Sequence, residues 1–124
     1  MVRTRLLPLL PLLLGGCPGT PAADCPNVSL SCPSPAPGYA STVGPLFATY
    51  CTRCHSPDGI EPRTPFLRSY GDVTAKQELS NVQGQIYSCK MPPEGEPRPT
   101  AAERTLILSW FACCAASDAG VCPP

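Results

Sequence analysis

The sequence predicts an all-α domain with long proline-rich loops. Apolar residues recur at helical spacing in three stretches, over about 43–54, about 72–88 and from 100 onward. No stretch alternates apolar and polar residues for long enough to predict a strand. The 124 residues include 18 Pro and 9 Cys. This composition favours a small core reinforced by cross-links over a large hydrophobic interior.

The first predicted helix covers about 43–54. Pro45 suits its first turn, since a proline there removes an N–H that has no partner within the helix. One face is apolar, with Leu46, Phe47 and Tyr50. The prolines that follow make 57–65 a loop.

The second predicted helical region covers about 72–88. Its apolar contacts are Val73, Leu79, Val82 and Ile86. Gly84 lowers the helical propensity of this stretch.

The last predicted helix has the clearest start. Thr100 is its N-cap, and Glu103 three residues later completes a capping box. The apolar face expected behind it comprises Leu106, Ile107, Trp110, Phe111 and Cys114.

The N-terminus has the form of an export signal. A basic start, Met1 to Arg5, precedes an apolar run from Leu6 to Leu14 that is too short to span a bilayer. Small residues then lead to Cys17, as in the lipobox of bacterial lipoproteins. We therefore expect residues 1–16 to be a lipoprotein signal peptide and Cys17 to carry the lipid anchor. The alternative is an ordinary secretory signal. Both interpretations place the protein outside the cytoplasm, in the bacterial periplasm or cell envelope.

Residues 17–40 are predicted to form a structure-poor tether, because six prolines fall between 18 and 37. The folded domain is then 41–124, which is small enough to need reinforcement from a bound group or from disulfides.

The motif Cys51-Thr52-Arg53-Cys54-His55 predicts a covalently attached haem. Two thiols at this spacing can add across the two vinyl groups of one haem, and the adjacent histidine can bind the iron. This is the only histidine in the chain. Three alternatives are a thiol redox pair, which belongs with a βαβ pattern absent here, a zinc site, and two disulfide cysteines beside a surface histidine.

Met91 is the candidate for the opposite axial position. Methionine commonly completes a six-coordinate electron-transfer haem, and the only other methionine is Met1. The prolines after Met91 stiffen its loop. The alternative is a methionine that fills a gap in the core.

Together these residues resemble the class I mono-haem cytochrome c family. The family's haem signature matches Cys51, Cys54 and His55, and its distal loop matches Met91-Pro92. Weaker similarities are Phe47 before the motif, 103–110 as the closing helix, and Pro65-Phe66-Leu67 after the motif. The resemblance covers about 41–115, and the extra cysteines depart from it.

The resemblance implies a small helical fold wrapped around one covalent haem c. Its iron would be held by His55 and Met91, and the Pro65 carbonyl would accept a hydrogen bond from the histidine ring. Such a protein transfers single electrons between exported redox proteins. It is a carrier and not an enzyme, so no catalytic residue is expected.

Other functions stay open at this point. A labile Met91 would make the protein a haem-based sensor or a peroxidase. A haem-free, disulfide-rich lipoprotein would be a binding module. The formal net charge of zero gives no sign of a nucleic-acid partner, and no small-molecule substrate is expected. The membrane is a partner only through Cys17.

The cysteine count supports disulfides. If one cysteine goes to lipid and two to haem, an even number remains: Cys25, Cys32, Cys89, Cys113, Cys114 and Cys122. We expect Cys89 to pair with Cys113 or Cys114, and Cys25 to pair with Cys32.

Overall fold

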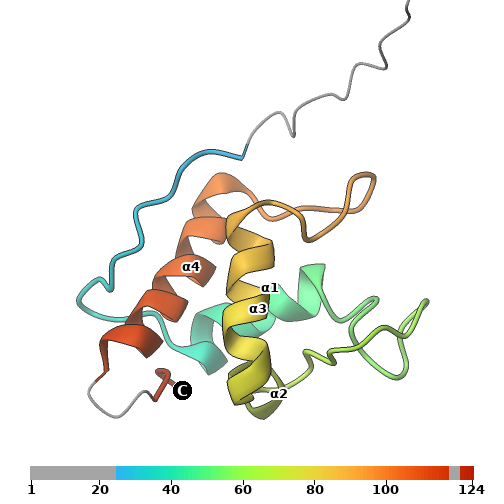
Figure 1. Ribbon diagram of the computed structural model, residues 1–124, viewed down its shortest axis with the longest axis horizontal. Coiled ribbons are helices and arrows are strands. Elements are labelled where there is room, and N and C mark those ends of the chain that lie inside the picture. The colour runs from blue at the N-terminus through green and yellow to red at the C-terminus, as the bar shows by residue number, and fades with distance from the viewer. Residues whose placement is uncertain (1–24, 118–120) are drawn as a thin grey trace, which may run out of the picture.

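The computed structural model describes residues 25–117 and 121–124. Its elements are a π-helical turn, η1 (Tyr39–Val43), followed by the four helices labelled in Figure 1: α1 (Gly44–Tyr50), α2 (Tyr70–Thr74), α3 (Lys76–Tyr87) and α4 (Ala101–Ala116). The described ranges contain no strand. The prediction of a helical domain with long loops is therefore confirmed.

Two predicted helices have different bounds in the structure. The first was expected over 43–54, but α1 ends at Tyr50 and the haem-type motif is a turn. The stretch 72–88 is two helices, because Ala75 adopts an extended conformation with φ −52° and ψ 127°.

A capping box begins α2, and sequence reasoning missed it. The Ser69 hydroxyl accepts a hydrogen bond from the Asp72 N–H (3.2 Å), and the Asp72 carboxylate accepts one from the Ser69 N–H (3.0 Å). A Ser-x-x-Asp pattern is the signal that could have identified this helix start.

The capping box predicted for α4 is confirmed. The Thr100 hydroxyl accepts from the Glu103 N–H (3.2 Å), and the Glu103 carboxylate accepts from the Thr100 N–H (2.8 Å). The same carboxylate accepts a hydrogen bond from the Tyr50 hydroxyl at 3.0 Å, which joins the start of α4 to the end of α1. The backbone hydrogen bond from Thr100 is the main reason that the pKa of Glu103 lies below its usual value.

An aromatic cluster forms the centre of the core. The Trp110 side chain is fully buried, with its ring centroid 5.5 Å from that of Tyr39 and 5.0 Å from that of Phe111. The C-terminal segment closes over this cluster. The Pro123 carbonyl accepts a hydrogen bond from Trp110 Nε1 (2.7 Å), and the Cys122 carbonyl accepts one from the Tyr70 hydroxyl (2.8 Å).

The predicted apolar face of α4 is partly wrong. Ile107, Trp110, Phe111 and Cys114 are buried, but Leu106 is 42% exposed. Leu108 and Cys113 are buried as well, so the second half of α4 is covered on more than one side.

The six remaining cysteines form three disulfides, but the expected pairings are wrong. The bonds join Cys25 to Cys89, Cys32 to Cys113, and Cys114 to Cys122. The first two link residues 64 and 81 positions apart. Such bonds depend on where distant segments meet in three dimensions.

Residues 25–37, which we call the strap, lack helix and strand. They were expected to belong to a free tether, but two disulfides fix them to the domain, and Figure 1 shows them passing along α4. The last residues of the predicted tether, Tyr39 and Ala40, belong to η1 and not to a structure-poor segment. Its first residues, 17–24, including Cys17, lie outside the described residues, as does the signal peptide. Within the described residues, no helix has both the length and the apolar character that a membrane span requires.

Candidate functional site

The Cys51–His55 motif is a tight turn at the end of α1. The Cys51 N–H donates to the Phe47 carbonyl (2.8 Å), which extends the helical bonding by one step. The Cys51 carbonyl then accepts from the N–H groups of Cys54 (3.2 Å) and His55 (2.8 Å). Because Phe47 is fully buried, the turn starts from a fixed point in the core.

The loop after the motif is tied to the motif's own carbonyls. The carbonyls of Arg53, Cys54 and His55 each accept one backbone hydrogen bond at 2.8 Å. The donors are the N–H groups of Ile60, Arg63 and Leu67, in that order.

Glycine is required at position 59 of this loop. A Cβ at Gly59 would collide with the carbonyl oxygen of Arg53.

This loop brings Pro65 to His55. The Nδ1 atom of the His55 ring lies 2.8 Å from the Pro65 carbonyl oxygen. Since a carbonyl can only accept, Nδ1 carries the proton in this contact, and Nε2 is then the nitrogen with a free lone pair. The contact that the cytochrome resemblance implied is present, and it orients the ring as carbonyl contacts orient metal-binding histidines.

Met91 is positioned by the end of α3. The N–H groups of Lys90 (3.0 Å) and Met91 (3.2 Å) both donate to the Gln85 carbonyl. Cys89, between them and the helix, has φ +55°, so the chain reverses direction there. The Met91 residue is 39% exposed, so it is not a core methionine.

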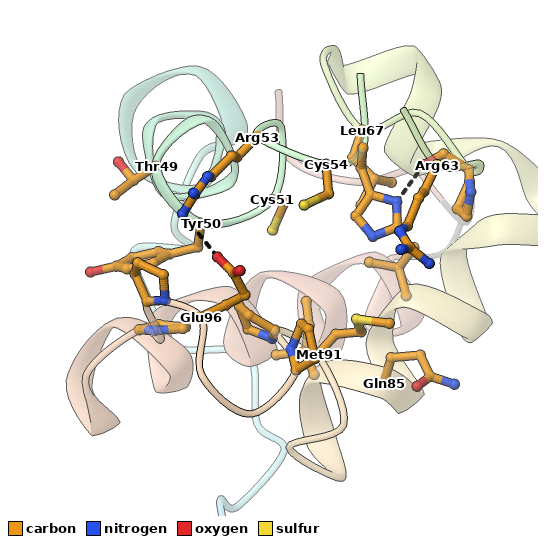
Figure 2. A pocket seen from close by; sticks show the side chains of 18 of the residues that line it. Thr49, Tyr50, Cys51, Arg53, Cys54, Arg63, Leu67, Gln85, Met91 and Glu96 are labelled. Carbon is orange, nitrogen blue, oxygen red and sulfur yellow. Dashed lines mark hydrogen bonds and ion pairs between the residues drawn. The ribbon is translucent and has the colours of Figure 1, made fainter. Parts of the chain in front are cut away.

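These segments enclose one cavity of about 570 Å³. Figure 2 shows Cys51 and Cys54 on one wall with their sulfur atoms toward the space, and Met91 on the opposite wall. Much of the remaining lining is apolar and comes from α3, α4 and the loops, including Leu67, Val82, Ile86, Pro92 and Ile107. The volume is typical of sites for small molecules and cofactors, which span roughly 300–1,000 Å³. The fold thus brings together all five predicted site residues of the domain: Cys51, Cys54, His55, Pro65 and Met91.

Cys51 and Cys54 are the free cysteines of the described residues. Burial raises the pKa of the Cys51 thiol to about 12. At neutral pH this thiol is protonated and is therefore a poor nucleophile for thiol–disulfide exchange. Cys51 therefore lacks the lowered pKa of an activated redox cysteine.

One prediction needs correction. The sequence analysis predicted a covalent haem c and a metal-binding role, but the described residues contain no group of three or more His, Cys, Asp or Glu side chains that could hold a metal ion. This finding contradicts the haem c prediction, and the zinc alternative also finds no site in these residues.

A haem needs fewer ligands from a protein than a free metal ion does. Iron in a porphyrin takes four nitrogen ligands from the macrocycle and needs at most two from the protein. Two donors in the cavity lining, His55 and Met91, together with the two free thiols, match that requirement in kind and number. The residues present are thus chemically suited to a flat, apolar redox group.

Two ion pairs lie among the residues that line the cavity. Arg53 forms an ion pair with Glu96 at 2.9 Å, which joins the motif turn to the loop that follows Met91. Arg63 pairs with the nearby Glu61 at 2.6 Å. Sequence reasoning did not identify Glu96, because nothing local connects it to a residue 43 positions away.

Comparison of the chain with family models, with characterised proteins and with solved structures finds no match.

Proposed function

We propose that this protein is an exported one-electron carrier of the c-type cytochrome class, and not an enzyme. The proposal depends on one observation above all. The two free thiols, the oriented histidine and the loop methionine, which lie up to 40 positions apart in the sequence, line the same largely apolar cavity.

Each residue has a distinct role in this proposal. Cys51 and Cys54 would form thioether links to the redox group, which is why they stay outside the disulfide network. His55 would bind through Nε2 while Pro65 holds Nδ1. Met91 would bind from the opposite wall. The iron-containing redox group would supply the reversible ferric–ferrous couple. The protein would supply its ligands and exclude water from it.

The lining favours electron transfer over substrate chemistry. If His55 and Met91 both bind the iron, they would leave no iron position open for a substrate. An apolar pocket and a methionine ligand both favour the ferrous state and raise the reduction potential. Electron exchange with partner proteins would occur where the cavity opens to solvent, through small and short-lived interfaces of less than about 1,200 Å².

Mass spectrometry tests the proposal. The full chain is exported from a host with active haem-ligation machinery, purified and denatured. We expect added mass of roughly 600 Da that survives denaturation, and loss of the covalent adduct when Cys51 and Cys54 are both replaced by Ala. The matched control removes Cys114 and Cys122 and should retain the added mass. A colourless product with the mass of the polypeptide alone would refute the proposal.

The role of Met91 has its own measurement. Met91→Ala should retain the covalent group but lower the reduction potential and give the spectrum of an iron with an open or water-bound sixth position. An unchanged potential and spectrum would show that Met91 does not bind the iron.

A further inference from the structure

Arg104 of α4 is a buried cation with no acidic partner among the described residues. It is 6% exposed. The ion pairs of the described residues have Arg53 and Arg63 as their basic members. A buried charge without a counter-charge is expensive unless hydrogen bonds replace its hydration. The contacts of Arg104 therefore indicate what this residue does.

The guanidinium donates its hydrogen bonds to backbone carbonyls at the end of α3. Nε donates to Ile86 (3.1 Å), and Nη2 donates to Tyr87. These carbonyls belong to the last turn of the helix, which has no intrahelical donors for its final C=O groups and carries a partial negative charge. Arg104 thus caps α3 from a neighbouring helix.

The same guanidinium holds the strap. Nη1 donates to the Pro26 carbonyl at 2.7 Å, and Nη2 lies 3.4 Å from Cys25 Sγ. Cys25 is bonded to Cys89, two residues before Met91. Arg104 and this disulfide therefore both hold the short segment that runs from Ile86 to Cys89, at the end of α3.

Met91 depends on this segment for its position. Its N–H and that of Lys90 donate to the Gln85 carbonyl, in the turn whose next two carbonyls bind Arg104. Gln85, Ile86 and Met91 all line the cavity. A shift of the last turn of α3 would move Met91 relative to the wall that carries His55.

We propose that Arg104, acting with the Cys25–Cys89 disulfide, is a positioning residue for Met91. The guanidinium holds the end of α3 by hydrogen bonds, and the disulfide holds Cys89, where the chain reverses direction. These contacts, which we call the lock, keep the Met91 thioether at a fixed place in the cavity lining. The importance of that place rests on the proposed function, but the lock itself does not, since it consists of contacts within the polypeptide.

Amide hydrogen exchange on the exported, full-length protein as purified tests the lock. We expect Arg104→Met to raise the exchange rates of the Lys90 and Met91 amides about tenfold to a hundredfold, as expected for loss of one or two hydrogen bonds from a charged donor. Arg104→Lys should restore part of the protection. Arg98→Met, an exposed arginine in the loop before α4, is the control and should change neither rate.

A disulfide variant keeps the test decisive if Arg104→Met does not fold. Cys25→Ala/Cys89→Ala should raise exchange at Lys90 and Met91 while the amide of Leu108 in α4 stays protected. Cys32→Ala/Cys113→Ala removes the other bond of the strap and should leave Lys90 and Met91 protected. Equal exchange at these two amides in all variants would overturn the proposal.

The positioning role of Arg104 and the proposed carrier function can fail independently of each other. If the lock variants behave as expected but no covalent group is found, the positioning role stands and the carrier function fails. If the group is present, the lock variants should also weaken the spectroscopic signature of the methionine–iron bond, while Arg98→Met should not. A normal signature together with fast exchange would show that the lock does not position Met91.

Discussion

The two sides of this molecule are stabilised in different ways. The side formed by η1, the second half of α4 and the C-terminal segment combines the aromatic cluster with two of the three disulfides. The cavity side is formed by loops around the 51–55 turn and residues 91–99, and its two cysteines are free. The contrast teaches that the packed core secures the fold, while the cavity side depends on a few contacts between loops and helix ends.

The largest expected effect comes from the centre of the core. Trp110→Ala removes a fully buried indole and its hydrogen bond to the Pro123 carbonyl. The free energy of unfolding should fall by about 3–5 kcal/mol. Leu106→Ala, on the exposed face of the same helix, should cost less than about 1 kcal/mol. Urea denaturation of both variants measures the difference, and equal losses would contradict the arrangement of α4.

The next effect compares bonded with free cysteines. Removing the Cys32–Cys113 disulfide by double alanine substitution should cost about 2–4 kcal/mol, because the unfolded chain regains a long loop. Replacing Cys51 and Cys54 in polypeptide made without haem-ligation machinery should cost about 1 kcal/mol or less, since no cross-link is lost. Thermal unfolding of both double variants tests this. A larger loss from the free pair would show that Cys51 and Cys54 are themselves cross-linked.

A smaller effect concerns pH at the junction of the two sides. The pKa of Glu103 is lowered in the folded protein, first by the Thr100 backbone hydrogen bond. The resulting stabilisation is fully present above the ordinary value of 4.5 and is lost as pH falls through the lower folded pKa. Glu103→Gln should therefore flatten the fall in Tm below about pH 4.5. Glu94→Gln, on the exposed loop before α4, is the control and should leave the slope unchanged.

The smallest effect is expected at the cavity rim. The Arg53–Glu96 pair joins the motif turn to the 91–99 loop, but both side chains are well exposed, at 52% and 37%. Glu96→Gln should change the free energy of unfolding by about 0–1 kcal/mol, and added salt should remove the difference. Glu61→Gln breaks the other exposed pair and serves as the comparison. A loss much above 1 kcal/mol from Glu96→Gln alone would make this pair a true anchor of the cavity.

Local chemistry was predictable from the sequence, and long-range geometry was not. The capping box of Thr100 and Glu103 lies within four residues, so its pattern was readable, and the resemblance was enough to expect Pro65 beside His55. In contrast, the break at Ala75 has no proline or glycine to mark it. Ala75 is the N-cap of α3 without a side-chain cap, so no capping residue marks the helix start either.

The disulfide partners and Arg104 show the same limit. Cysteines 64 and 81 positions apart carry no local sign of pairing, and proximity in sequence wrongly favoured Cys25 with Cys32. Arg104 reads as a surface residue near the start of a helix. Its burial follows from the strap, whose return to the domain is fixed by those same disulfides.

The bond between Cys25 and Cys89 has a consequence for the whole protein at a bilayer. If Cys17 carries lipid, only eight peptide steps separate the membrane from a residue fixed on the domain, and a fully extended chain of that length spans no more than about 29 Å. That is close to the diameter of a small domain. The domain would then be held close to the bilayer surface and could not diffuse away from it.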